Sequence, residues 1–540
     1  MRILSARSRQ GNFRFVVLCT ATLGLLLQAA ATFAQVDVAT YHYDTLRSGQ
    51  NLHETVLTPS VVNVNTFGKL FSQPVDGQVY GEPLVVYNLQ IIGQGTHTVV
   101  YVATENDSVF AFDGNSNGGK DATPLWQVSF INPAKGITTI PSTDLGTIAI
   151  NPQIGITGTP VIDVTNETLY VVAATKENGS YYQRLHALDI RTGAEKFGGP
   201  VVISATVKGS GSNSVKGYVS FDPLRSNQRP ALLLVNGVIY IAWASHGLET
   251  VDPYHGWVMA YNETTLAQVG AFCVTPNGDQ GGIWQDGDGL AADTLGNIFF
   301  MSGNGTFDAN NNGGDYGQSY VRLSTARGLS VGDYFTPYNA VKESAADLDL
   351  GSGGPLLFPY QTGAANPYLA VGAGKDGSLY LINRDNMGGF NGKSNKIVQQ
   401  ITSAFNGHSV YSTPAYWQGN LYYWATYDTL RIFQMKNGLL GTSPVATSTY
   451  SIPSPGATPV ISSNGSTNGI VWVLDTSDAL TAPVILHALD AQTAVELYNS
   501  TQNATRDQAG DAVKFTIPTV ANGKVYVGTE TELDVYGLLP

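Results

Sequence analysis

Residues 345–388 read AADLDLGSGGPLLFPYQTGAANPYLAVGAGKDGSLYLINRDNMG. Two carboxylates, Asp347 and Asp349, precede a glycine-rich turn and an apolar pair. Two stretches of alternating apolar residues then flank the turn at Lys375. Such alternation on both sides of a glycine-containing turn predicts a β-hairpin. The stretch therefore predicts short antiparallel strands, with the two acids and the lysine on the turns between them.

The composition extends this prediction to the whole chain. Of 540 residues, 60 are Gly and 28 are Tyr, while charged residues make up only 13%. Many glycines with abundant Tyr, Val and Thr are typical of short strands joined by tight turns. No long stretch after the N-terminus has helical periodicity. The length would allow several domains, although β-rich folds can also run this long as one unit.

Residues 1–34 have the features of a secretory signal peptide. A basic start is followed by an apolar run at 15–27 and by small residues that end at Ala34. The apolar run is too short to span a bilayer comfortably as a helix. We expect cleavage after Ala34 and a periplasmic or secreted protein without a transmembrane span. An uncleaved anchor is the alternative.

The expected mature chain is strongly acidic. Residues 1–34 contain four Arg and no acid, so their removal changes the net charge from −13 to −17. This charge argues against nucleic acid and against anionic membrane surfaces as partners. Cys273 would be the only remaining cysteine, which excludes an internal disulfide. No C-x-x-C-H sequence is present, so we expect no covalently attached haem.

A repeated unit runs through the chain. Each unit begins with a small residue, a proline and an apolar pair, continues with a strand of the type V-Y-V-A, and ends with a strand of the type A-L-D. In one unit Gly289-Leu290-Ala291 replaces the proline segment. The prolines of the other units are Pro83, Pro160, Pro230, Pro355, Pro414, Pro459 and Pro518.

Units of this size with several strands each predict a β-propeller. We expect an all-β fold: one eight-bladed propeller of four-stranded antiparallel blades, formed by residues 35–540 as a single domain. The last unit, 514–540, has only three clear strands. We expect the N-terminal segment 40–48 to supply the missing edge strand and close the ring. Two separate sandwiches are the alternative architecture.

A closed ring gathers the start of every innermost strand around one channel, so distant residues can meet there. Loops carry function more often than the elements that they connect. Long connections should therefore mark the functional face. They fall at 114–156, 205–228, 244–256, 303–318 and 384–408.

Several motifs follow one another in a recognisable order. They are ASHGLETVDPYHGWVMAYN (244–262), GGIWQDGDGLAAD (281–293), IFFMSGNGTFD (298–308), LDLGSGG (348–354) and GKDGSLYLINRDN (374–386). Together with the opening YHYDTLRSGQNLHETVLTPSVVNVNTFGKL (41–70), they resemble the quinoprotein alcohol dehydrogenase family. Members of that family bind pyrroloquinoline quinone, and the resemblance covers nearly the whole mature chain.

The resemblance implies a role for five residues. Asp349 corresponds to the catalytic base, and Lys375 to the basic residue that hydrogen-bonds the quinone. Asn304 and Glu249 correspond to ligands of a calcium ion that also touches the quinone. Trp284 corresponds to the tryptophan that stacks under the quinone ring. The implied activity is the oxidation of an alcohol or a sugar, with electrons passed to an external acceptor.

These residue types suit that chemistry. Calcium prefers oxygen ligands, which carboxylate and amide groups supply, and a bound calcium ion acts as a Lewis acid. A carboxylate can take a hydroxyl proton, and a lysine can stabilise charge that develops on an oxygen. An indole ring offers an apolar stacking surface.

Each residue also has a simpler structural interpretation. Trp284 could belong to the core, and Asn304 could merely suit a turn between two glycines. Asp349 could cap a turn, Glu249 could be a solvated loop acid, and Lys375 could lie at a hairpin tip.

The sequence also departs from the family pattern. The adjacent Cys-Cys pair is absent, no arginine matches the one expected near the cofactor carboxylates, and the blade-docking motif is degenerate (TGAEKF, 192–197). The alternative function is therefore a non-catalytic propeller that serves as a protein- or glycan-binding scaffold.

The sequence DANNNG at 308–313 matches the first half of an EF-hand calcium loop. The twelfth position is Ser319 instead of the bidentate Glu, and no helical pattern flanks the loop. The match predicts a glycine-rich surface turn, with weak calcium binding as the lesser alternative.

Overall fold

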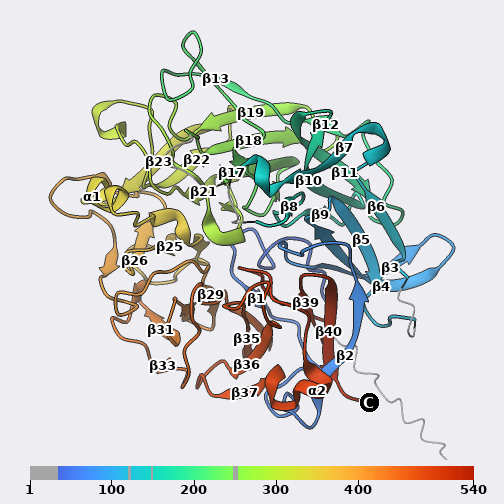
Figure 1. Ribbon diagram of the computed structural model, residues 1–540. Coiled ribbons are helices and arrows are strands. Elements are labelled where there is room, and N and C mark those ends of the chain that lie inside the picture. The colour runs from blue at the N-terminus through green and yellow to red at the C-terminus, as the bar shows by residue number, and fades with distance from the viewer. Residues whose placement is uncertain (1–34, 119–122, 147–149, 247–252) are drawn as a thin grey trace, which may run out of the picture. The chain divides into compact units, whose positions relative to one another are not determined.

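The computed structural model describes residues 35–118, 123–146, 150–246 and 253–540, all within one compact unit. This unit is a β-propeller in which eight sheets of four to six strands surround a central axis (Figure 1). A small hairpin, β13 (Thr206–Lys208) with β14 (Tyr218–Ser220), lies in a connection between sheets. The predicted all-β, eight-bladed fold is confirmed. The predicted signal peptide at 1–34 lies outside the described residues.

The first four blades follow one another along the chain. Blade 1 contains β3 (Leu84–Ile91), β4 (Gly95–Thr104), β5 (Ser108–Asp113) and β6 (Trp126–Ser129). Blade 2 contains β9 (Val161–Asp163), β10 (Thr168–Glu177), β11 (Ser180–Asp189) and β12 (Val201–Val202), with β7 (Ile137–Pro141) and β8 (Gln153–Ile154) added. Blade 3 contains β15 (Ser226–Asn227), β16 (Leu233–Val235), β17 (Val238–Ser245), β18 (Trp257–Asn262) and β19 (Gln268–Cys273). Blade 4 contains β20 (Ala291–Ala292), β21 (Ile298–Met301), β22 (Tyr320–Ser324), β23 (Ser330–Thr336) and β27 (Gly389–Phe390).

The other four blades complete the ring. Blade 5 contains β24 (Leu356–Leu357), β25 (Leu369–Ala373), β26 (Leu379–Asn383) and β28 (Gln399–Ile401). Blade 6 contains β29 (Ala415–Trp417), β30 (Asn420–Trp424), β31 (Leu430–Lys436), β32 (Leu439–Leu440) and β33 (Ala446–Thr447). Blade 7 contains β1 (Gln50–Asn51), β34 (Val460–Asn464), β35 (Thr467–Asp475), β36 (Ile485–Asp490) and β37 (Glu496–Asn499). Blade 8 contains β38 (Thr519–Ala521), β39 (Lys524–Gly528), β40 (Glu532–Leu538) and β2 (Phe67–Pro74).

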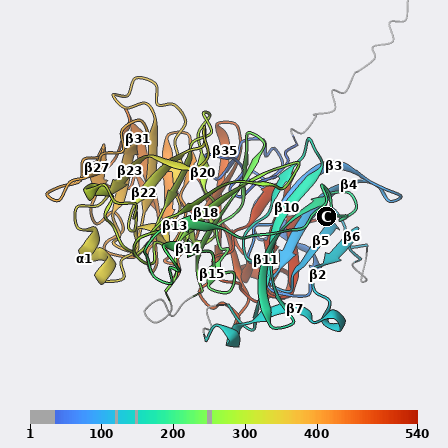
Figure 2. The same ribbon diagram turned by 90° about the horizontal axis from the view of Figure 1, so that it is seen from above.

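Helices are few and short in the described residues. The α-helices are α1 (Ala340–Ala345) and α2 (Ala504–Asp507). The 3-10 turns are η1 (Pro133–Lys135), η2 (Ser142–Asp144), η3 (Gln285–Gly287), η4 (Ala309–Asn311), η5 (Leu350–Ser352) and η6 (Ser500–Asn503). None of these helices has the length and apolar character needed to cross a bilayer. Figure 2 shows α1, β7 and β15 towards the same face of the ring, so several long connections gather there.

The blades pack face to face, which explains why their strands are apolar on both sides. Leu379 and Leu381 of β26 belong to a core cluster shared with blade 6. Tyr380 and Ile382, which alternate with them, belong to a cluster shared with blade 4. Successive side chains of a strand point to opposite faces of the sheet. Full burial of such a side chain contributes roughly 1.5–3 kcal/mol, so each blade is stabilised by both of its neighbours.

The N-terminal region closes the ring, but with a different strand from the one predicted. β2 pairs with β40 in antiparallel register, from Phe67 opposite Leu538 to Pro74 opposite Glu532. The prediction that 40–48 forms this edge strand is wrong. His42, Tyr43 and Arg47 have positive φ angles of 58°, 72° and 61°, which depart from the extended backbone of a regular strand.

Instead, residues 38–51 cross the middle of the ring and contact every blade; we call them the central segment (Figure 1). Its backbone bonds six blades through Val38–Val85, Ala39–Ile162, Thr45–Ala292, Leu46–Leu357, Ser48–Tyr416 and Gly49–Ile461. Side chains reach the other two: Arg47 Nη2 donates to Leu232 O of blade 3, and Asn51 Nδ2 donates to Val520 O of blade 8.

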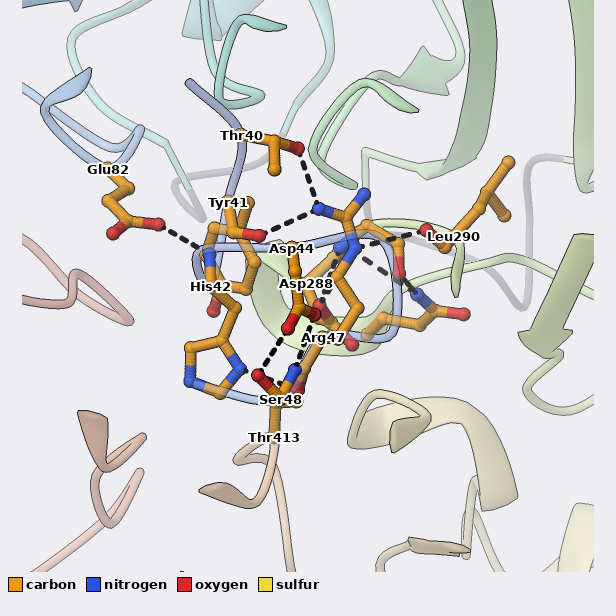
Figure 3. Close-up of polar contacts among 12 residues, drawn as sticks. Thr40, Tyr41, His42, Asp44, Arg47, Ser48, Glu82, Asp288, Leu290 and Thr413 are labelled. Carbon is orange, nitrogen blue, oxygen red and sulfur yellow. Dashed lines mark hydrogen bonds and ion pairs between the residues drawn. The ribbon is translucent and has the colours of Figure 1, made fainter. Parts of the chain in front are cut away.

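The Arg47 side chain makes several of the polar contacts that hold the central segment in place (Figure 3). Its side chain is fully buried, and its N–H groups donate to Leu290 O at 3.0 Å, Thr40 Oγ1 at 3.0 Å and Tyr41 O at 2.7 Å. Asp288 is also fully buried and lies 3.9 Å from Arg47 Nε. The guanidinium thus links two parts of the central segment to each other, and it also links the segment to the inner edge of blade 4.

Candidate functional site

Asp349 and Lys375 come together because of the order of strands in blade 5. Asp349 lies just before η5 and β24, and Lys375 lies on the turn between β25 and β26. β25 runs antiparallel to β24, which returns the chain to the level of Asp349. Lys375 N donates to Asp349 O at 2.9 Å. Gly374 allows this approach, since a Cβ there would lie 2.5 Å from Asp349 O.

The two side chains form an ion pair that includes a second acid. Lys375 Nζ lies 2.5 Å from Asp349 Oδ2 and 3.1 Å from Asp347 Oδ1. Burial alone would lower the pKa of Lys375, but Asp349 and Asp347 outweigh it, so the pKa is raised above its ordinary value. The Asp349 side chain is 9% exposed and that of Asp347 is 72% exposed. Asp349 is therefore the inner acid of the pair.

Asn304 reaches the same cluster from the β21–β22 loop of blade 4. Its N–H donates to Asp349 Oδ1 at 2.6 Å, and its Nδ2 donates to Asp347 Oδ1 at 2.8 Å. Its Oδ1 is buried and has no hydrogen-bond partner among the described residues. Gly303 must be a glycine, because a Cβ there would collide with Asp349 Oδ1.

Trp284 borders the cluster from the segment that precedes the inner strand of blade 4. A Cβ on Gly303 would lie 3.2 Å from Trp284 Cδ1, so the indole edge is next to Asp349 as well. The turn after Trp284 is strained: Gln285 and Asp286 have φ angles of 48° and 47°. The structure thus brings together Trp284, Asn304, Asp349 and Lys375. Glu249 lies outside the described residues.

Arg229 is a member of this face that the sequence analysis missed. It is only 5% exposed, and its guanidinium lies 5.3 Å from the Tyr80 ring centroid and 5.6 Å from that of Phe515. Its Nη2 donates to Asp286 O at 3.2 Å. The only sequence signal was its position directly before Pro230, where a unit begins. Lys514 adds a further cation, 4.8 Å from the Phe515 ring centroid.

Asp286 connects Arg229 with the Asp349 cluster electrostatically. Burial raises its pKa to about 8, while Arg229, Lys514 and Lys375 lower it and Asp349 raises it. Its Oδ2 is buried without a partner among the described residues. Glu105, from the β4–β5 turn, has a pKa raised by burial to about 7. Buried acids and cations therefore interact electrostatically around Asp286 and Glu105.

The residues present fit part of a quinone and calcium site. The free Asn304 Oδ1 is a suitable ligand for a hard cation. Arg229, Lys375 and Lys514 offer positive charge for an anionic cofactor. No group of three or more His, Cys, Asp or Glu placed to hold a metal occurs among the residues that the structure describes. The cavity beside Tyr411 and Phe515 has a volume of about 10 Å³, and none of Trp284, Asn304, Asp349 and Lys375 lines it.

Solved structures of dehydrogenases share this fold. The quinohemoprotein alcohol dehydrogenase from Comamonas testosteroni superposes with a TM-score of 0.56 at 14% identity, over 93% of this chain and 80% of that chain. The quinohemoprotein alcohol dehydrogenase ADHIIG from Pseudomonas putida HK5 gives 0.54 at 13% identity, with coverages of 93% and 80%. A europium-containing methanol dehydrogenase gives 0.58 at 12% identity, with coverages of 93% and 98%.

These likenesses establish the fold. This chain shares its eight-bladed propeller fold, which the repeat predicted, with these solved dehydrogenases. No family model matches the sequence, and no curated protein matches it either. Its activity therefore has to be argued from the site.

Proposed function

We propose that the protein is an exported quinoprotein-type dehydrogenase that oxidises an alcohol or a sugar with pyrroloquinoline quinone and calcium. The observation that carries this proposal is the convergence of Asn304, Asp349 and Lys375, from two blades, in one cluster. The amide oxygen left free at Asn304 adds to it.

The roles of the residues follow from their contacts. Asp349 is the candidate base: it would accept the substrate hydroxyl proton on Oδ2 once that oxygen is released from Lys375. Lys375 remains protonated, because its pKa is raised, and would stabilise negative charge on an oxygen beside it. Trp284 would provide the apolar side of the cofactor site.

Cofactor and metal binding would divide among the remaining residues. Asn304 Oδ1 and Glu249 are the candidate calcium ligands, and Arg229 with Lys514 would hold cofactor carboxylates. When bound, the quinone supplies a two-electron acceptor and calcium a Lewis acid. An external acceptor would then remove the electrons. Periplasmic or secreted location follows from the predicted signal peptide.

Reconstitution of the mature chain, residues 35–540, tests the proposal. Quinone is titrated in the presence of calcium with binding followed by tryptophan fluorescence, and dye reduction is then measured with a panel of alcohols and sugars. Asp349→Asn should abolish dye reduction and keep quinone binding within a few-fold, whereas Arg229→Met should weaken quinone binding at least tenfold. Absence of quinone binding by the wild-type chain would rule the proposal out.

The second candidate is a non-catalytic propeller that binds a protein or a glycan. The pairing of Lys375 with two acids favours it. A chain that folds normally, binds calcium and shows no quinone binding would support this second function.

A further inference from the structure

The loop 308–315 has a narrow neck formed by two aspartates. Asp308 N donates to Asp315 O at 3.2 Å, and Asp315 N donates to Asp308 Oδ1 at 2.8 Å. Phe307 and Tyr316, one residue further out, form an antiparallel bridge. Both acids are therefore held at the base of the loop, and η4 (Ala309–Asn311) lies between them.

Asp315 carries an oxygen that no described residue binds. The residue is 1% exposed, and its Oδ1 accepts a hydrogen bond from Asn277 N at 2.9 Å. Its Oδ2 is buried and has no partner among the described residues. A buried carboxylate oxygen without a donor is costly and rare in folded proteins, so this oxygen calls for a cation or a donor from beyond the described residues.

The loop offers further oxygens at regular spacing. Asp308, Asn310 and Asn312 follow the pattern D-x-N-x-N-G, in which alternate side chains of a calcium loop act as ligands. Gly313 has no room for a side chain, because a Cβ there would collide with the Asp308 carboxylate. The Asp308 carboxylate therefore lies directly against Gly313, inside the loop. Asn310 and Asn312 are exposed.

We propose that loop 308–315 binds one calcium ion through the carboxylates of Asp308 and Asp315 and the amide oxygens of Asn310 and Asn312. Two carboxylates with amide or carbonyl oxygens form a ligand set that a hard cation accepts. The absent twelfth-position Glu is replaced in charge by Asp315, which the fold brings to the neck. This site requires no quinone and does not include Asn304.

The ion would fix the segment that carries Asn304. Asp315 Oδ1 is bonded to Asn277 N, and Thr306 N donates to Asp279 O at 3.1 Å. Gly281 N in turn donates to Asn304 O at 2.7 Å. Calcium in the loop would therefore brace two segments on the same side of the ring as Asn304.

Terbium luminescence tests the proposal on the mature chain after removal of metal with EGTA and without quinone. Tyr316 and Tyr334, whose ring centroids lie 5.3 Å apart next to Asp315, are suitable sensitisers. We expect sensitised emission that saturates at one ion and is displaced by calcium. Asp315→Asn and Asp308→Asn should each weaken terbium binding at least tenfold. Asp385→Asn, on an exposed turn, should leave it within twofold.

The outcomes are decisive in either direction. No sensitised emission from the wild-type chain, or emission lost in Asn304→Ala but kept in Asp315→Asn, would overturn the proposal. If Asp315→Asn does not fold, the double variant Asn310→Ala/Asn312→Ala decides, because both side chains are exposed: tenfold weaker binding supports the site, and unchanged binding refutes it. Failure of quinone binding would leave this result untouched.

Discussion

Lys375 Nζ lies 2.5 Å from Asp349 Oδ2, and the Lys375 backbone N–H also donates to Asp349 O. The two residues are thus joined twice, once by an ion pair and once by the backbone. The backbone hydrogen bond fixes the position of the Lys375 main chain. Only the Lys375 side chain then has to be ordered to form the ion pair. Loss of the lysine would leave the largely buried Asp349 carboxylate without its counter-ion.

Lys375→Met should destabilise the protein by about 1–3 kcal/mol, because removing one partner leaves the other charge uncompensated and partial exposure reduces the cost. The urea midpoint at constant m measures the effect. Lys393→Met, at an exposed position, is the matched control and should stay within about 0.5 kcal/mol. Equal midpoints for the two variants would contradict the prediction.

The pH dependence of this ion pair has a defined sign. The folded pKa of Lys375 is raised, so its stabilisation is complete below the unfolded value of about 10.4 and is lost only as pH rises through the folded value. The difference in stability between wild type and Lys375→Met should therefore be constant from about pH 6 to 9. A difference that grows with pH in this range would show that the folded pKa of Lys375 is lowered and not raised.

Gly303→Ala should damage the site more than the fold. A Cβ there collides with Asp349 Oδ1 and comes within 3.2 Å of Trp284 Cδ1. Overpacking of this kind costs about 1–3 kcal/mol, and the proposed quinone binding should weaken at least tenfold. Gly392→Ala is the control, since a Cβ there would be in ordinary contact at 3.7 Å from the Phe390 ring. Thermal unfolding and quinone titration of both variants make the comparison.

Asp288→Asn should make stability less dependent on pH. Burial raises the pKa of Asp288 to about 8, and Arg47 lowers it only in part, because the Arg47 N–H groups donate to Leu290 O and Tyr41 O. A raised folded pKa means that the stabilisation is present below the unfolded value of about 3.9 and is lost as pH rises towards 8.

Wild type should therefore lose roughly 1–3 kcal/mol relative to Asp288→Asn between about pH 5 and 8. Urea unfolding at several pH values measures this loss. Other buried acids titrate in both proteins and cancel in the difference. Asp385→Asn should show no such trend. If the stability of the wild type rises relative to that of Asp288→Asn as pH rises, the pKa of Asp288 is not raised in the folded protein.

Arg47→Met should cost about 3–5 kcal/mol, since it strands several buried carbonyl oxygens and removes the positive charge near Asp288. Arg47→Lys should rescue little of the loss, because an ammonium group cannot reproduce the forked geometry of a guanidinium. Melting followed by near-UV circular dichroism compares both variants with Arg327→Met, an exposed arginine. Full rescue by lysine would show that charge alone matters.

The sequence predicted the propeller because the repeat is local. Each unit contains its own proline, apolar strands and turns, and β24 to β26 lie where the pattern places them. Segment 40–48 was misread because its structure depends on carbonyl groups of other blades. The buried fork of Arg47, which satisfies Leu290 O and Leu232 O, has no local signal.

The same distinction applies to the site. Asp349 and Lys375 could be paired in advance because one blade carries both. Arg229 and Asp347 could not be assigned, because their importance arises from neighbours brought by other segments: Tyr80 and Phe515 around Arg229, and Asn304 with Lys375 around Asp347. The roles of Asp349, Lys375, Asn304, Trp284 and Glu249 in catalysis or in binding a cofactor are still predictions.

Pairing of β2 with β40 joins an N-terminal and a C-terminal strand in blade 8, and we call this strand pair the seam. Phe67 and Leu538 are 471 positions apart (538 − 67) and lie opposite each other. Contacts this distant in sequence form late, because their loop-closure entropy must be overcome first. A chain that lacks its last residues leaves β2 as an unpaired edge, which is a template for aggregation and for recognition of unfinished protein. The seam thus couples integrity of the C-terminus to solubility of the whole molecule.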